Sequence, residues 1–169
     1  MTEILIRQAE PSDYADVVQM HYPSWRESYR GILAPQVLDL FDRQQWIDEE
    51  YPQRLNRAGW AMWLAESDGR LIGMTVFGPE LANPGQLEID SLYIAVDNQR
   101  RGVGGLLLDH ALAAHPSGDA VVWCAERNFR ARRFYQKKGF QLDGRTFTWT
   151  LVPGVVEAPQ VGYRLQRSC

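Results

Sequence analysis

The amino-acid sequence predicts an α/β fold built on a mixed, mostly antiparallel sheet of about six to seven strands flanked by helices. An Asp-Gly turn joins two alternating apolar runs at residues 60–66 and 71–78, which is a strong hairpin pattern. A second alternation, of Thr with Phe, Trp and Leu over residues 146–151, predicts another hairpin near the end of the chain. Strands at 87–96 and 120–125 are separated by a helical segment, and a crossover of this kind makes them parallel neighbours.

The other elements follow from local patterns. Residues 3–9 alternate as a short first strand, and a helix starts at Pro11 with Ser12 or Asp13 as its cap. Residues 21–55 have a helical pattern that is rich in aromatic side chains.

A second helix within that stretch is predicted to begin at Pro35 and to continue through Phe41. After the break at Pro153-Gly154, alternation predicts the last strand. Acidic side chains gather in the later part of the helical stretch, at Asp39, Asp42, Asp48, Glu49 and Glu50.

Length and composition fit an ordinary globular protein. The 169 residues predict one domain over residues 1–169, and 45% are hydrophobic while 23% are charged. The net charge of −3 gives no overall attraction to nucleic acid or to an anionic membrane. No apolar run reaches the roughly 20 residues that span a bilayer. With no signal-peptide pattern at the start, and only Cys124 and Cys169 as cysteines, we expect a cytoplasmic protein without a disulfide framework.

A glycine-rich turn between a strand and a helix predicts a phosphate site. Residues 99–105 read Gln-Arg-Arg-Gly-Val-Gly-Gly and lead directly into an apolar-faced helix. The first turn of a helix has free N–H groups and a partial positive charge, both of which favour an anion. Gly102, Gly104 and Gly105 let the anion approach the backbone, and Arg100 and Arg101 can add charged hydrogen bonds.

Two motifs in this order identify a family resemblance. Gln99-x-x-Gly102-x-Gly104 resembles the acetyl-CoA motif of the GNAT superfamily of N-acetyltransferases, (Q/R)-x-x-G-x-(G/A). Residues 128–140 then match every fixed position of the family's second motif, N-x-x-A-x-x-F-Y-x-x-x-G-F. The residues agree independently, because Asn128 can cap a helix that Gly139 ends.

The resemblance implies the GNAT fold, acetyl-CoA as co-substrate and a sheet that opens beside the glycine turn to admit pantetheine. On this resemblance, the backbone of Ile94 and Val96 would bind the pantetheine amides, and Asn128 would contact the pantetheine arm. The cofactor-binding set implied by the turn and the two motifs is Ile94, Val96, Gln99, Arg100, Arg101, Gly102, Val103, Gly104, Gly105, Asn128 and Tyr135.

Acyl transfer to an amine sets three chemical requirements. The amine must lose a proton, since its ordinary pKa is about 10.4, and the departing thiolate must be protonated or stabilised. The thioester carbonyl must also be polarised, which backbone N–H groups can do. Glu88 and Asp90 point to one face of the same strand and are the candidate bases, with a water chain as the competitor. Tyr135 matches the family's tyrosine, whose hydroxyl faces the sulfur, and is the candidate acid.

The acceptor is the part that the sequence defines least. In the family, the first helical region and the last hairpin hold it, which here brings in Trp25, Tyr29 and Trp149, with Trp46 and the acids of residues 39–50. Aromatic rings and acids suit a cationic amine, and they suit a packed amphipathic helix equally well. A small-molecule or peptide amine is the expected partner, and we leave open whether the chain forms a homodimer.

Two other functions remain as alternatives. The chain could be a non-catalytic acyl-CoA-binding sensor on the same scaffold, or an adaptor that binds nucleic acid or protein through the basic segment 127–138. We expect no nucleic acid, because the overall balance is acidic and no base-stacking motif accompanies the basic segment. We expect no metal, because the histidines lack ligand spacing. Cys124 is predicted to fill the core rather than to act as a nucleophile.

Overall fold

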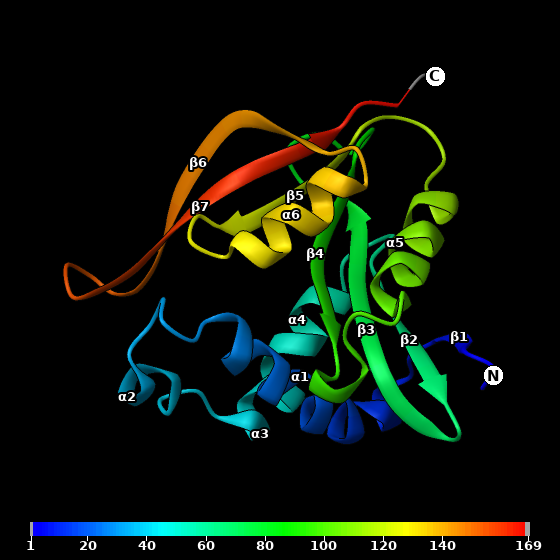
Figure 1. Cartoon of the computed structure of the whole chain (residues 1–169), viewed down its shortest axis with the longest axis horizontal. Helices are drawn as coiled ribbons and strands as arrows, with labels where there is room; N and C mark the ends of the chain where they lie inside the picture. The colour runs from blue at the N-terminus through cyan, green and yellow to red at the C-terminus, as the bar shows by residue number, and fades with distance from the viewer. Residues whose placement is uncertain (1, 168–169) are drawn as a thin grey trace.

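The computed structural model describes residues 2–167 and contains one seven-stranded sheet in the order β1-β2-β3-β4-β5-β7-β6 (Figure 1). Each pair of neighbours is antiparallel except β4 and β5, which are parallel. The mixed, mostly antiparallel α/β prediction is therefore confirmed, together with both hairpins. The strands are β1 (Leu5–Gln8), β2 (Ala61–Ser67), β3 (Arg70–Pro79), β4 (Leu87–Ile94), β5 (Ala120–Ala125), β6 (Gln141–Val152) and β7 (Val156–Leu165).

Helices occupy the connections and differ widely in length. Two helices follow the two sequence motifs directly, α5 after the glycine turn and α6 after Asn128. The full set is the 3-10 helix η1 (Pro11–Asp13), α1 (Tyr14–Ser28), α2 (Pro35–Leu38), α3 (Arg43–Gln45), the π-helix η2 (Trp46–Glu50), α4 (Tyr51–Leu55), the 3-10 helix η3 (Val96–Asn98), α5 (Val103–Ala114) and α6 (Phe129–Lys137).

The start of the first helix differs from the prediction. A 3-10 turn begins at Pro11 and is capped by Glu10. Asp13, one of the two predicted caps, is the N-cap residue of α1, although its side chain makes no cap hydrogen bond to that helix. Pro favours the first helical position, so the cap moves one residue before it. The Asp13 carboxylate accepts the Glu10 N–H at 2.8 Å and binds Arg7, so it closes the turn from its other end.

The helix that starts at Pro35 ends earlier than predicted. It stops after Leu38, which is buried, and does not continue through Phe41. The helix does not continue, because the Asp42 side chain accepts the Gln44 N–H at 2.8 Å and caps the start of the next helix. The π-helix η2 then follows, so the predicted helical stretch consists of short pieces.

Strand β4 carries an extra residue at its centre. Val76 of β3 pairs with Ser91, while the next residue, Phe77, pairs with Ile89, which leaves Asp90 as a β-bulge. A bulge changes which face the following side chains occupy. Ile89 and Leu92 accordingly pack in the same core, although they are three residues apart. The strand also ends at Ile94, and not at residue 96 as predicted, because η3 follows.

The two branches of the sheet separate beyond the first residues of β4. Strands β4 and β5 pair only over residues 87–89 and 120–122, although β4 continues to Ile94 and β5 to Ala125. One face of the sheet is covered by α1, η2 and α4, and the other by α5 and α6. Figure 1 shows the β6–β7 hairpin arching away from β3 and β4, with α6 beside β5. This separation creates the space in which the site lies.

Candidate active site

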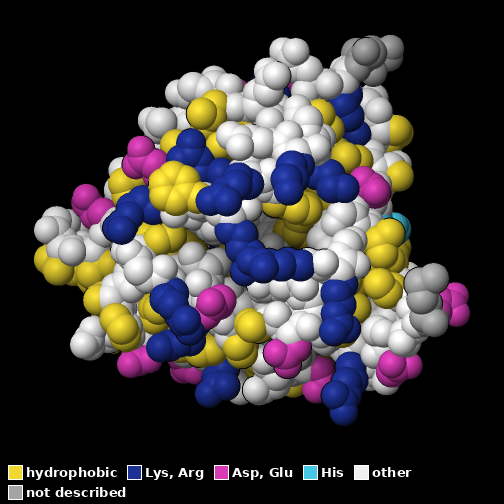
Figure 2. Space-filling view, in the orientation of Figure 1, with side chains coloured by type: hydrophobic (Ala, Val, Ile, Leu, Met, Phe, Trp, Pro, Cys, Tyr) yellow, Lys and Arg dark blue, Asp and Glu magenta, His cyan; other side chains and the backbone are white. Residues whose placement is uncertain are grey.

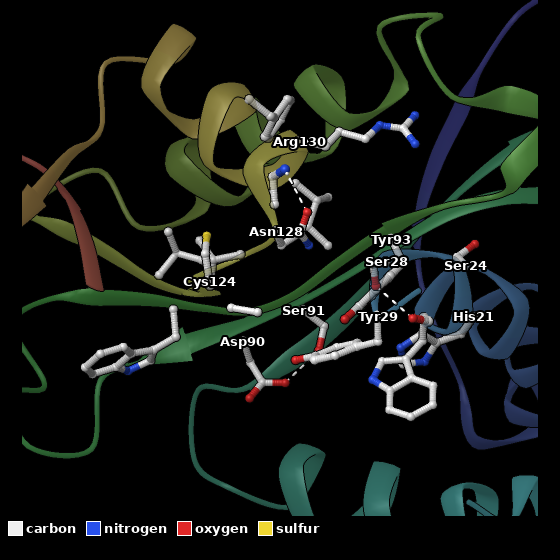
Figure 3. A pocket seen from close by; sticks show the side chains of 18 of the residues that line it. His21, Ser24, Ser28, Tyr29, Asp90, Ser91, Tyr93, Cys124, Asn128 and Arg130 are labelled. Carbon is white, nitrogen blue, oxygen red and sulfur yellow. Dashed lines mark hydrogen bonds between the residues drawn. The ribbon is translucent and has the colours of Figure 1, made fainter. Parts of the chain in front are cut away.

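A cavity of about 1640 Å³ lies where β4 and β5 separate. It is lined by the end of β4, the glycine turn, the first turns of α5 and α6, and side chains from α1, η2, α4 and β6. Figure 3 shows Asn128, the residue before α6, and Arg130 of α6 across the cavity from Asp90 and Ser91 of β4. Segments that are far apart in the sequence therefore meet around one space.

The glycine turn has the backbone shape that the prediction requires. Arg100 and Gly102 both adopt left-handed conformations, with φ of 66° and 82°. Gly102 is the residue before α5, so the first N–H groups of that helix open at the turn. A Cβ on Gly102 would meet nothing within 4 Å, and Gly104 and Gly105 line the cavity. This open backbone fits a diphosphate, which would lie against the start of α5.

The end of β4 presents a free backbone donor to the gap. The Ile94 carbonyl accepts hydrogen bonds from Ser24 Oγ at 2.8 Å and Gln99 Nε2 at 3.1 Å. The next residue, Ala95, donates its N–H to Ile72 of β3. In an antiparallel ladder the direction alternates, so the Ile94 N–H points toward the gap. Gln99 thereby holds the turn against the strand.

Three residues of the predicted cofactor set do not line the cavity. Val96 lies in η3 with its side chain exposed, and Arg101 is also exposed. Val103 is buried against Leu107 in the core beneath α5. The other predicted cofactor residues line the cavity: Ile94, Gln99, Arg100, Gly102, Gly104, Gly105, Asn128 and Tyr135.

Helix α6 supplies a cap and a buried phenol. The Asn128 side chain accepts the Ala131 N–H at 3.2 Å, as a helix cap does. Tyr135 is 6% exposed and packs at its ring edge against Phe140. Burial is the main cause that raises the pKa of Tyr135 well above its ordinary value. Its hydroxyl therefore stays protonated and can donate a hydrogen bond.

Basic side chains surround the α6 side of the cavity. Figure 2 shows Lys and Arg side chains around a hollow on this face. Such side chains complement a phosphate-rich ligand. Those that line the cavity from this side are Arg100, Arg127, Arg130, Arg133 and Lys137.

The two candidate bases have different surroundings. Both Glu88 and Asp90 line the cavity. The Asp90 carboxylate is held by Ser91 Oγ at 2.7 Å and by Arg54 Nε at 3.2 Å. Burial, followed by the nearby charges of Asp90 and Glu80, raises the pKa of Glu88. The Glu88 carboxylate thus takes up a proton more readily than an ordinary glutamate does.

The three predicted acceptor residues lie together. Trp25 of α1 and Tyr29, which directly follows that helix, lie 6.4 Å and 5.5 Å from Trp149 of β6, measured between ring centroids. All three line the cavity, and Phe41 packs beside them. Trp46 also lines the cavity, and it packs edge-on against Trp25. These rings form a wall between the first helix and the last hairpin.

The acids expected beside these rings are mostly elsewhere. Of the five, only Glu50 lines the cavity. Asp39 pairs with Arg26 at 2.7 Å, and the others bond to neighbouring Gln side chains or backbone on exposed helical faces. The short helices turn these acids outward, so the expectation of an acidic acceptor wall holds for Glu50 alone.

Sequence reasoning missed several cavity residues. Arg54 and Ser91 contact Asp90. The His21 ring packs in a tilted arrangement against Tyr93, with 4.6 Å between ring centroids, and His21 Nδ1 forms a hydrogen bond with Tyr51 Oη at 2.8 Å. Burial, with the charge of Arg54 second, lowers the pKa of His21 to about 3, so it is neutral. No local motif marks these residues, because their role depends on the β4 bulge and on the packing of α1 and α4.

Cys124 faces the cavity but is an unreactive thiol. It is buried, and burial raises its pKa to about 12, so the thiolate form is scarce. This agrees with the core-filling role that the sequence predicts. Cys169 lies outside the described residues. In residues 2–167, no group of three or more His, Cys, Asp or Glu side chains is arranged to hold a metal ion. No helix in the same range has the length and apolar character that a membrane crossing requires.

This fold and cavity are those of a transferase that uses an acyl thioester of coenzyme A. The sequence profile of the acetyltransferase (GNAT) family matches residues 18–140. A probable N-acetyltransferase of Mycobacterium tuberculosis is 54% identical over 168 residues, which cover 99% of this chain and 96% of that protein. The chain therefore belongs to the GNAT family, and it is an acetyl-CoA-dependent N-acetyltransferase.

Solved structures agree with the fold. The PaiA N-acetyltransferase of Thermoplasma acidophilum, in complex with coenzyme A, has a TM-score of 0.76 and 17% identity over 98% of this chain and 99% of that chain. A ribosomal-protein-alanine N-acetyltransferase of Brucella melitensis has a TM-score of 0.72 and 17% identity over 96% and 99%. At this identity the likeness defines the architecture alone.

Proposed function

We propose that the chain transfers the acetyl group of acetyl-CoA directly to a primary amine while both substrates occupy the cavity. The observation that carries this proposal is that the groups needed for acetyl transfer line one cavity. A glycine turn at a helix N-terminus, a free strand N–H, a buried phenol and a raised-pKa carboxylate all line the same cavity. Acetyl-CoA supplies the acetyl group and a thiol leaving group.

In this proposal the backbone holds the cofactor. The first N–H groups of α5 and the side chain of Arg100 bind the diphosphate. The Ile94 N–H binds the pantetheine arm in the gap between β4 and β5. Gln99 acts indirectly, since its bond to the Ile94 carbonyl fixes the end of the strand.

Glu88 takes the proton of the acceptor amine. Its raised pKa brings it closer to neutral pH than an ordinary carboxylate, which suits a general base. Asp90 is less suited, because Arg54 and Ser91 already hold its carboxylate. A chain of water molecules that ends at Glu88 would carry the amine proton to the same carboxylate.

Tyr135 protonates the departing thiolate. Its phenol is buried beside the cavity and stays neutral at physiological pH. A thiol has an ordinary pKa of about 8.5, so the thiolate gains from a nearby donor. Tyr135 recovers its proton from solvent through the open cavity.

The acceptor enters between α1 and the β6–β7 hairpin. Trp25, Tyr29 and Trp149 form one wall there, and Glu50 adds a carboxylate. Aromatic faces attract cations, so an amine with a cationic or aromatic part fits this wall. The acceptor is a small molecule or a peptide.

A thiol-release assay tests the proposal. The full chain is mixed with acetyl-CoA and, separately, with polyamines, aminoglycosides, amino acids and short peptides. The expected result is amine-dependent release of free thiol together with acetylated amine detected by mass spectrometry. Tight coenzyme A binding without turnover across the whole panel would support the non-catalytic sensor instead.

A further inference from the structure

Arg54 joins three elements at the acceptor side of the cavity. Its guanidinium reaches Glu50 of the π-helix η2 at 2.7 Å and Asp90 of the β4 bulge at 3.2 Å. All three side chains line the cavity. Glu50 and Asp90, which are 40 positions apart in the sequence, are therefore linked by one cation.

The position of Arg54 is fixed by local structure. The π-helix η2 leads directly into α4, whose first residue, Tyr51, is 4% exposed and bonds to His21 at 2.8 Å. This buried contact anchors the start of α4 against α1. On the strand, the bulge turns Asp90 toward the cavity, where Arg54 meets it.

We infer that Arg54 is a positioning residue for acetyl transfer, which holds Asp90 in an ion pair and so leaves Glu88 as the carboxylate that takes the acceptor's proton. This inference rests on the proposed function. Arg54 is not placed in contact with either substrate. It acts by compensating the charge of Asp90, the nearest carboxylate to Glu88 along the strand.

The charges that face Glu88 determine the sign of the effect. Asp90 of β4 and Glu80 at the end of β3 favour its protonated form, while Arg57 after α4 and Arg145 of β6 favour its ionised form. Arg145 is itself paired with Glu80 at 3.5 Å, and Arg57 lies over the Trp60 ring.

Loss of Arg54 leaves the negative charge of Asp90 without its paired cation. Asp90 also faces Tyr93 of its own strand, which is neutral and supplies no counter-charge. Without the guanidinium, the negative charge of Asp90 acts more strongly on Glu88 and raises its pKa. Removal of the Asp90 charge has the opposite effect, and it also removes the route through which Arg54 acts.

The alternative is that Arg54 only ties α4 to the sheet. In that case its replacement lowers the melting temperature, and the titration of Glu88 stays unchanged. The two roles can be separated in a variant whose residue 90 is neutral. There, a purely structural role of Arg54 and a role that acts through the Asp90 charge predict different effects of replacing Arg54 on the pKa of Glu88.

The experiment is an NMR titration of the Glu88 side-chain carboxyl carbon in the full chain, without substrates. The variants are Arg54→Met, Asp90→Asn and the double variant. We expect Arg54→Met to raise the pKa of Glu88 by roughly 0.5 to 1 unit, which is the size of one partly screened charge. In the Asp90→Asn background, the same replacement should shift the pKa of Glu88 less, because no Asp90 charge remains for Arg54 to hold.

Two further variants control for folding and for charge. Arg54→Lys keeps the cation and should leave the pKa of Glu88 near the wild-type value, even if Arg54→Met is unstable. Arg26→Met removes an arginine whose ion pair with Asp39 lies outside the cavity lining, and it should leave Glu88 unchanged. Equal Glu88 titrations in wild type and Arg54→Met, or an equal shift in both Asp90 backgrounds, would overturn the inference.

The pH–rate profile separates this inference from the proposed function. With an active amine, the acidic limb of the profile should move up in Arg54→Met by the same amount as the pKa of Glu88. Turnover with an unmoved limb contradicts the role of Arg54 and leaves acetyl transfer intact. Absence of turnover with every amine contradicts the proposed function, and the NMR titrations then decide the Arg54 inference alone.

Discussion

The cofactor side and the acceptor side of the cavity are built in different ways. On the cofactor side, a turn and the helix that follows it form the site from consecutive residues, 99–105 and 128–135. On the acceptor side, Arg54, Asp90 and Trp149 come from α4, β4 and β6. A site made of backbone N–H groups at the start of a helix can be predicted from a short sequence motif. A site made of side chains from several elements depends on tertiary packing and has no such motif.

Replacing Tyr135 by Phe tests the chemistry that joins the two sides, and it should have the largest effect. The change removes only the hydroxyl, so coenzyme A affinity should stay near wild type. The loss of a proton donor should lower kcat by about 100-fold or more where chemistry limits the rate. Single-turnover kinetics and calorimetry measure the two quantities. Tyr163→Phe is the matched control, since its hydroxyl bonds to Arg132 outside the cavity lining. Wild-type turnover in Tyr135→Phe would remove the acid role.

Replacing Glu88 by Gln tests the proton acceptor on the acceptor side. Glu88 must be ionised to act as a base, and its pKa is raised by burial, so activity should rise with pH through that pKa. The Gln variant should lose this acidic limb and about 100-fold in kcat. Asp90→Asn should keep the limb and move it to lower pH, because a neighbouring negative charge is removed. An unchanged profile in Glu88→Gln would point to a water chain that does not end at Glu88.

Replacing Gly104 by Val tests the cofactor side. A Cβ at this position would touch the Phe134 ring at 3.4 Å, which is ordinary contact, so the helix should still fold. The branched side chain would occupy cavity space that the diphosphate needs, and coenzyme A affinity should fall about tenfold or more, which corresponds to about 1.4 kcal/mol. Calorimetry measures the loss. Leu106→Val changes an exposed position on the same helix and should bind as wild type does.

Replacing Trp149 by Ala should have the smallest effect. It tests whether Trp149 belongs to the acceptor side of the cavity and not to the cofactor side. The ring belongs to the acceptor wall, at 5.5 Å from Tyr29. The KM for the amine should rise by roughly three- to tenfold, the range of one cation–π or stacking contact, while the KM for acetyl-CoA stays the same. A larger change in the KM for acetyl-CoA than for the amine would place Trp149 on the cofactor side.

The same difference explains what the sequence predicts and what it does not. The hairpins, the parallel β4–β5 pair, the cap at Asn128 and the left-handed Gly139 follow from local patterns and are confirmed. The early end of the helix at Leu38 and the 3-10 turn after Ile94 are not, because side-chain caps and short turns compete closely with helix and strand.

The acceptor site shows the same limit more strongly. Periodicity predicts that Glu88 and Asp90 share a strand face, and both line the cavity. It does not reveal the bulge at Asp90 or the arginine that contacts this residue. Most acids of the helical stretch face outward because a π-helix and short helices shift the angular position of each side chain. The periodicity of apolar residues in the sequence does not predict this change in the direction of the side chains.

A crystal structure with coenzyme A tests the central claim, that the backbone at the start of α5 holds the cofactor inside this cavity. We predict that the diphosphate lies against the N–H groups of residues 102–105 and that the sulfur lies within reach of the Tyr135 hydroxyl. Phosphates bound away from that turn, or a sulfur outside the gap between β4 and β5, would contradict the account.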